Sequence, residues 1–115
     1  EGIVIATMFN PERSGRQLKE FIDAYRERYD FEPDVWAAQG YDSIKLLSYA
    51  IERTEVTTPS EIAGVLRNQK EWTGVMGKAE FNTDGEMIGR EVYKKVVKNG
   101  EMRYLKEQGG GMQNE

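Results

Sequence analysis

The sequence contains no cysteine and no histidine. The missing cysteine rules out thiol nucleophiles and thiolate metal ligands. The missing histidine rules out Ser-His triads, imidazole metal sites and the side chain that most often moves protons near neutral pH. The redox compartment cannot be read from a cysteine-free chain, because such a chain is stable on either side of a membrane.

Long apolar runs and an excess of positive charge are also missing. No stretch approaches the roughly 20 apolar residues that a membrane-spanning helix needs. The 115 residues carry 20 acidic and 16 basic side chains, for a net charge of -4. The basic residues are dispersed along the chain, so no basic patch is visible and nucleic acid is not an expected partner. A chain of this length is enough for one domain with a modest core.

The N-terminal third predicts a strand followed by a helix. Residues 2–7 form a short apolar, β-branched run that is typical of a buried strand, and Pro11 ends it. Ser14 with Gln17 three positions later has the pattern of a capping box at a helix start. Large apolar side chains then recur at helical spacing and predict one buried face. They are Leu18, Phe21, Ile22, Tyr25 and Tyr29.

A second helix is predicted from Pro33 or Asp34 to Arg53. Proline suits the first turn of a helix, and an acidic residue there complements the helix dipole. Gly40 lies in mid-helix, where glycine costs about 1 kcal/mol, so we expect a neighbouring element to approach closely there. The predicted apolar stripe consists of Trp36, Ala37, Gly40, Ile44, Leu47 and Ile51.

The C-terminal half predicts a third helix and then antiparallel strands. Thr58-Pro59-Ser60-Glu61 has the cap, first-turn proline and glutamate of a helix start. Asn82 to Gly85 is typical of a turn, residues 90–98 alternate like a strand, and Asn99-Gly100 predicts a hairpin back into 101–105. Residues 108–115 are expected to form a disordered tail. The predicted order is therefore strand, three helices and antiparallel hairpin, an α/β chain.

Three residues of the second helix are candidates for a site. Trp36 lies in the first turn, beside small residues, so its ring either packs in the core or forms a wall against a small molecule. Tyr41 and Asp42 follow. Tyr41 either packs or enters the polar shell of a ligand, and Asp42 either bonds backbone or solvent or takes that same ligand role.

A third candidate is a partial calcium-loop pattern. Glu80, Asn82, Asp84 and Glu91 fall at positions 1, 3, 5 and 12 of the template, with Gly85 at position 6. The first ligand is Glu rather than Asp, and a strand rather than a helix follows the pattern. A tight turn at Gly85 accounts for the same residues, so no metal and no cofactor is expected. No carboxylate pair is held by an obvious frame, so an enzyme is not expected.

Taken in order, these segments resemble the periplasmic branched-chain amino-acid binding proteins, the type I solute-binding receptors of ABC transporters. The resemblance rests on GIVIATMFNP at 2–11, on the aromatic spacing of 21–29, and on WAAQGYD at 36–42. It extends through LLSYAI at 46–51, the glycine-rich stretch 73–85 and the final hairpin. The resemblance covers the chain to about Leu105 and implies the C-terminal third of a fold with two α/β lobes and a ligand cleft.

The resemblance implies a division of the chain between two lobes. Residues 1–10 would be a strand and an inter-lobe crossing, and 11–80 the helical part of one lobe. Residues 81–107 would be a second crossing, at Phe81 to Gly85, and the hairpin of the other lobe, with 108–115 as the tail.

It also implies a site, partners and a location. Trp36 would line the cleft, with Phe9 and Tyr41 as further candidate ligand contacts; the bulk of Trp36 leaves an aromatic ligand open beside an amino acid. The partners would be a small-molecule ligand and an ABC permease, outside the cytoplasm. A fragment cut across two lobes is expected to bind ligand weakly and to form a homodimer through its bare faces. A calcium-binding or interaction module and a sensory domain of the same fold are the alternatives.

Overall fold

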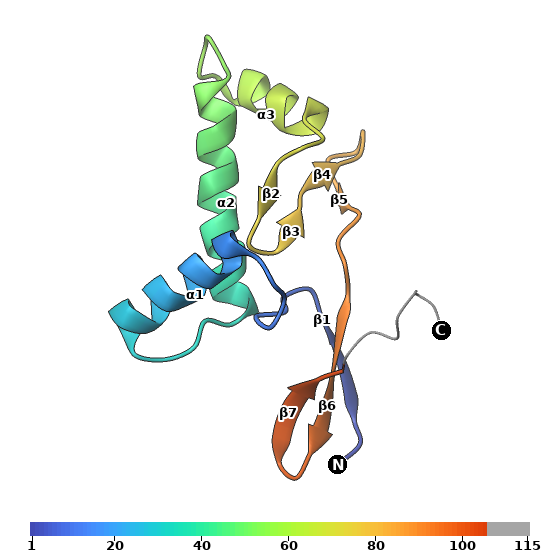
Figure 1. Ribbon diagram of the computed structural model, residues 1–115. Coiled ribbons are helices and arrows are strands. Elements are labelled where there is room, and N and C mark those ends of the chain that lie inside the picture. Colours follow the sequence, from blue (N-terminus) through green and yellow to red (C-terminus); the bar gives the residue numbers. More distant parts are fainter. Residues whose placement is uncertain (106–115) are drawn as a thin grey trace.

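The structure is a computed structural model, and it describes residues 1–105 (Figure 1). The predicted tail at 108–115 lies outside these residues. The helices are α1 (Arg16–Tyr29), α2 (Val35–Glu52) and α3 (Pro59–Asn68). The longer strands are β1 (Val4–Thr7), β6 (Tyr93–Lys98) and β7 (Glu101–Tyr104). Four two-residue strands lie between α3 and β6, namely β2 (Thr73–Gly74), β3 (Gly77–Lys78), β4 (Glu80–Phe81) and β5 (Met87–Ile88).

The two ends of the described chain meet in one antiparallel sheet of order β1-β6-β7. Val4 pairs with Val96, and Val96 pairs with Arg103 on its other side. The predicted hairpin is confirmed, because Asn99 and Gly100 both have positive φ, at 52° and 78°. Such angles are what a tight turn between twisted strands requires.

The described chain is elongated rather than spherical. Its radius of gyration is 16.6 Å, whereas a compact domain of this length has roughly 13 Å. Figure 1 shows why: the three helices and the two short hairpins form one part, and the β1-β6-β7 sheet projects from it. The outer strands β1 and β7 are mostly exposed among the described residues, and Ile3 and Val4 are 63% and 55% exposed. The prediction of a buried first strand is therefore wrong for this chain.

The start of α1 differs from the predicted capping box. The helix begins at Arg16, its N-cap is Gly15 with a φ of 146°, and no side chain caps it. Ser14 therefore lies outside the helix and cannot bond to its first turn. The predicted apolar face is largely confirmed, because Leu18, Phe21 and Ile22 are buried.

Helix α2 is capped by Asp34, whose carboxylate accepts a hydrogen bond of 2.8 Å from the backbone N–H of Ala37. Pro33 precedes this cap, so it lies one residue outside the helix rather than in its first turn. The predicted start near Asp34 and end near Arg53 are otherwise confirmed. Helix α3 begins as predicted, with the Thr58 side chain accepting from the N–H of Glu61 and Pro59 as the first residue.

The buried face of α2 is not the predicted one. Every fourth residue is buried instead, namely Ala38, Asp42, Leu46 and Ala50. The predicted stripe lies on nearly the opposite side of the helix, and its members Trp36 and Ile44 are 74% and 69% exposed. A β-carbon on Gly40 would meet nothing within 4 Å among the described residues. The predicted stripe is therefore the wrong face, because burial depends on which side of α2 the neighbouring elements cover.

One core holds the helical part together. The turn between β2 and β3 carries Val75 and Met76, whose buried side chains pack in one cluster with side chains of α1 and α2. Seven buried side chains form this core, namely Phe9, Leu18, Phe21, Ile22, Ala38, Val75 and Met76. Because Phe9 follows β1 directly, the core also anchors the chain where it leaves the sheet.

Two connections join the helical part to the sheet. The first runs from Met8 to Gly15, and the second is the extended stretch 89–92 between β5 and β6 (Figure 1). The second connection lies later than the expected crossing at Phe81 to Gly85. Those residues instead form β4 and the turn into β5, where Asn82 accepts backbone hydrogen bonds from Asp84 and Glu86.

Candidate functional site

Trp36 lies in the first turn of α2 with its ring open to solvent. It is 74% exposed, the highest value for any large apolar side chain in the described chain. The cap at Asp34 determines where the helix begins and hence where this ring projects. An exposed tryptophan contributes no packing energy to this chain, so the core interpretation of Trp36 does not hold among the described residues. Its large flat surface is available to another molecule or to another part of the protein.

Tyr41 has packing contacts that Trp36 lacks. Its ring lies 4.7 Å from the ring of Phe21, at an interplanar angle of 44°, and the ammonium of Lys45 lies 5.5 Å from its centroid. Tyr41 is 37% exposed. These contacts give Tyr41 a structural role between α1 and α2, because a tilted aromatic pair at this distance stabilises packing.

Phe9 is part of the core rather than of a surface. The ring is 2% exposed and meets Phe21 edge-on at 6.5 Å. Its backbone carbonyl accepts a hydrogen bond of 2.9 Å from the Tyr104 hydroxyl of β7. Through these two contacts Phe9 connects the helical core to the projecting sheet.

Asp42 is the one buried charged or polar residue in the described chain, with 4% exposure. Its two carboxylate oxygens each accept a hydrogen bond of 2.9 Å, one from the N–H of Val75 and one from the N–H of Met76. A carboxylate that accepts backbone N–H groups holds a turn in place much as it caps a helix. Of the interpretations left open by the sequence, the bond to backbone is the one that the structure shows.

The residues of the calcium-loop pattern are used in other contacts. Glu80 forms an ion pair of 3.5 Å with Lys70, and the Asn82 side chain is bonded within its own turn. Gly85 has a φ of 84°, as the alternative of a tight turn predicts. Within residues 1–105, no group of three or more acidic side chains is arranged to hold a metal ion.

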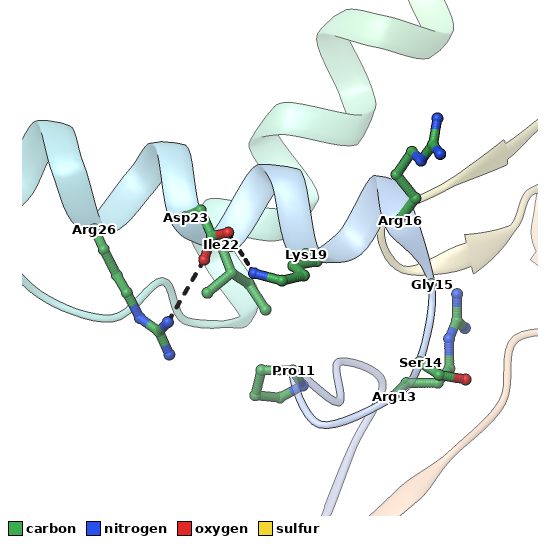
Figure 2. Close-up of a pocket in the computed structure, with 9 residues that line it drawn as sticks. All are labelled: Pro11, Arg13, Ser14, Gly15, Arg16, Lys19, Ile22, Asp23 and Arg26. Atoms are coloured by element: carbon green, nitrogen blue, oxygen red, sulfur yellow. Dashed lines mark hydrogen bonds and ion pairs between the residues drawn. The ribbon is translucent and has the colours of Figure 1, made fainter.

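The fold gathers basic side chains that look dispersed in the sequence. A broad, open cavity of about 470 Å³ lies at the start of α1 (Figure 2). Its basic lining residues are Arg13, Arg16, Lys19 and Arg26. Asp23 neutralises part of this charge, since it lies 2.7 Å from the Lys19 ammonium and 3.7 Å from Arg26. The signal in the sequence was the spacing of Arg16, Lys19 and Arg26, three and seven residues apart, because it places them on one side of α1.

A second cavity of about 240 Å³ lies where both connections meet the β2–β3 turn. Arg13 comes from the first connection and Arg90 from the second, with Lys78 at the end of β3. Arg13 donates a hydrogen bond of 3.3 Å to the Tyr93 hydroxyl, which links the first connection to β6. Neither cavity includes Trp36.

The arrangement defines a class of protein. Helices packed around a core, a separate antiparallel sheet and two connections between them make up part of a type I periplasmic-binding-protein fold. The family described as periplasmic binding protein matches residues 1–101. The chain belongs to this family.

Solved structures agree with this assignment. The chain is similar to an ABC transporter substrate-binding protein from Desulfitobacterium hafniense in complex with Leu, with 38% identity and a TM-score of 0.85. That match covers 91% of this chain and 31% of the other. The leucine binding protein LivK from Thermotoga maritima has 31% identity and a TM-score of 0.80, over 92% of this chain and 30% of that one.

A third structure is LivJ from Streptococcus pneumoniae in complex with isoleucine, with 27% identity and a TM-score of 0.75. It is matched over 89% of this chain and 30% of its own. The chain thus spans about a third of the length of these solved relatives. The relatives are substrate-binding proteins of ABC transporters, which are not enzymes. A comparison with curated proteins found no match. No helix in the described chain is long and apolar enough to cross a membrane.

Proposed function

We propose that this chain is the C-terminal third of an extracytoplasmic solute-binding protein that captures a small molecule, an amino acid or a related compound, for an ABC permease. The observation that carries the proposal is the 38% identity, over 91% of the chain, with a substrate-binding protein in complex with Leu. The proposed protein is a receptor and not an enzyme, and it works in the periplasm or outside the cell.

The two connections are the proposed hinge between the lobes. In this scheme the helical part, with both short hairpins, belongs to one lobe and the β1-β6-β7 sheet to the other. The second boundary then lies at 89–92 rather than at 81 as in the expected division into 1–10, 11–80 and 81–107. The contacts of Arg13 with Tyr93 and of Tyr104 with the Phe9 carbonyl span this junction. Closure of two lobes over a ligand requires a few connecting residues that absorb the change in angle, and short extended segments suit that role.

Trp36 is the proposed ligand contact. Its exposure and its place beside Ala37 and Gly40 leave room for a small molecule against the ring. Phe9 and Tyr41 are proposed to support the site from within, because the Phe9 ring is in the core and the Tyr41 ring packs on Phe21. The ring of Trp36 also accommodates an aromatic ligand, and the test therefore includes one.

The test is titration calorimetry on the longer protein that contains this chain, with leucine, isoleucine, valine and benzoate. We expect saturable binding of at least one amino acid and a loss of roughly tenfold or more in affinity for Trp36→Ala, since a buried aromatic contact is worth about 1.4 kcal/mol or more. Trp72→Phe is the matched control. Unchanged affinity in Trp36→Ala would show that Trp36 does not contact the ligand. Absence of binding to all four compounds would refute the choice of ligands.

The isolated chain of 115 residues is proposed to self-associate and to bind ligand poorly. It carries part of the contacts of a cleft, and its apolar stripe on α2 and the side chains Ile3, Val4 and Met102 at its sheet are exposed. Contiguous exposed apolar surface favours association, and an open sheet edge adds a second route. Micromolar binding of leucine by a monomer of the isolated chain would contradict both statements.

A further inference from the structure

The guanidinium of Arg90 lacks a strong acceptor although it is partly buried. Its Nη1 is the single buried side-chain nitrogen or oxygen without a hydrogen-bond partner in the described residues. Its Nε donates at 2.9 Å to the sulfur of Met87, and a thioether is a weak acceptor. Burying a charged donor without a partner costs free energy, so a group with this geometry calls for an anion.

The carboxylate of Asp42 does not serve as that anion. Asp42 lies close enough for its charge to act on Arg90, but the two form no ion pair, and both oxygens of Asp42 are bonded to the β2–β3 turn. Burial lowers the pKa of Arg90. The charge of Asp42 opposes this shift, and the charge of Arg13 adds to it. The Arg90 guanidinium therefore stays charged with its hydrogen-bonding capacity largely unused.

The cavity beside Arg90 presents further positive charge. Its lining includes Arg13, Lys78 and Arg90, with Glu91 as the one acidic residue. Arg13 is positioned by the hydrogen bond from its Nη1 to the Tyr93 hydroxyl. The same nitrogen lies beside Gly77, 3.2 Å from where a β-carbon would stand on that residue. Two arginines from separate connections thus converge on one space of about 240 Å³.

We propose that this cavity is a binding site for a small oxyanion, a carboxylate or a phosphate, held between Arg13 and Arg90. Guanidinium groups present paired donors that match the oxygens of these anions. The site is separate from Trp36 and independent of the proposed transport function. A bound anion would join the two connections through one shared ligand and so stiffen the junction between the helical part and the sheet.

The test is an NMR titration of the 115-residue chain, following the backbone amides of Gly77 and Gly89. Sodium phosphate and sodium acetate are added separately at constant ionic strength, with sodium chloride as the reference. We expect saturable chemical-shift changes of both amides with at least one oxyanion. The anion that binds more tightly, phosphate or acetate, identifies the chemical class of the ligand. Shifts that grow without saturation, or that match those with chloride, would overturn the proposal.

Variants assign the effect to the cavity. Arg90→Met is expected to weaken binding roughly tenfold or more, since a hydrogen bond to a charged group contributes about 1.5 to 3 kcal/mol. The control is Arg67→Met, an exposed arginine on α3 away from the cavity. Arg90→Lys keeps the charge without the paired donors and is expected to be intermediate, which provides a measurement even if Arg90→Met unfolds. Equal affinity in wild type and Arg90→Lys, or shifts confined to the amides at the start of α1, would overturn the assignment.

Discussion

The carboxylate of Asp42 occupies the space that a β-carbon on Gly74 would need. All three atoms nearest to such a carbon belong to that carboxyl group, and each lies within overlap distance. The same carboxylate accepts hydrogen bonds from the next two residues, Val75 and Met76. Helix α2 and the β2–β3 turn are therefore joined at a point where neither residue can change without the other moving.

Gly74→Ala is predicted to destabilise the chain strongly. The added methyl group must displace Asp42, which breaks one or both of its hydrogen bonds and shifts Val75 in the core. We expect a loss of about 3 kcal/mol in the free energy of unfolding, measured by urea denaturation. Gly64→Ala is the control, because nothing lies within 4 Å of a β-carbon there and residue 64 is helical. If Gly74→Ala lowers the free energy of unfolding no more than an ordinary surface substitution does, the close contact between Gly74 and Asp42 is contradicted.

Asp42→Ala and Asp42→Asn are both predicted to destabilise the chain, Asp42→Ala more strongly. Alanine leaves two buried N–H groups without an acceptor, at a cost of roughly 3 kcal/mol or more. Asparagine retains one acceptor oxygen but turns an amide donor toward the other N–H, so we expect a loss of about 2 kcal/mol. Thermal unfolding followed by circular dichroism measures both. Asp84→Asn, at an exposed turn, is expected to leave the midpoint nearly unchanged, and equal midpoints for Asp42→Asn and Asp84→Asn would refute the prediction.

Tyr104→Phe is predicted to weaken the junction between sheet and core. It removes the hydrogen bond to the Phe9 carbonyl, worth about 1 kcal/mol. We expect faster amide hydrogen exchange in β7 and little change in α3. Tyr25→Phe is the control, because it removes a hydroxyl from a partly buried tyrosine whose ring packs against Phe21. Equal exchange in the two variants would show that the hydroxyl of Tyr104 does not hold β7.

The same hydroxyl predicts a pH dependence at the alkaline end. Burial raises the pKa of Tyr104 above its usual value, and the charge of Glu12 raises it further. A raised pKa in the folded state means that this stabilisation is complete below the usual tyrosine pKa of about 10 and is lost as the pH rises through the folded-state value. Unfolding titrations from pH 8 to pH 11, run on wild type and Tyr104→Phe, should converge at the alkaline end. Parallel curves would contradict the role of this group.

Ile44→Glu is predicted to reduce self-association of the isolated chain. Ile44 lies in the exposed apolar stripe of α2. If this stripe forms the dimer interface, the introduced glutamate loses its hydration there, which weakens association. Gln39→Glu places the same charge at an exposed position of the same helix, well away from Ile44 around the helix axis, and is the matched control. Sedimentation velocity over a range of concentrations should show a shift toward monomer in Ile44→Glu alone. A monomer in the wild-type chain at every concentration would refute the dimer itself.

Local structure was predictable where neighbouring residues decide it. Asn99 and Gly100 tolerate positive φ and so determine their turn, and Thr58 with Pro59 begins α3 because a cap acts within one helical turn. The prediction for Ser14 was wrong because a cap motif permits a helix start but does not require one. Gly15, with a φ of 146°, is the N-cap instead, and α1 begins at Arg16 without a side-chain cap. The family resemblance rested on this ordered set of local signals, and the family match over 1–101 confirms it.

Tertiary contacts were not predictable from the same patterns. Asp42 and Val75 are 33 positions apart, and no local pattern in either segment predicts the contact between them. The same holds for Arg13 and Arg90, which meet only because two connections run past one turn.

The sequence by itself determined the type and order of the main helices and strands, because capping, turn geometry and periodicity act over a few residues. Only the tertiary structure decided which apolar face of α2 is covered, that Trp36 is exposed, and that Asp42 is buried. The physical reason is that burial depends on the atoms that lie opposite a residue, and in this chain those atoms come from distant segments.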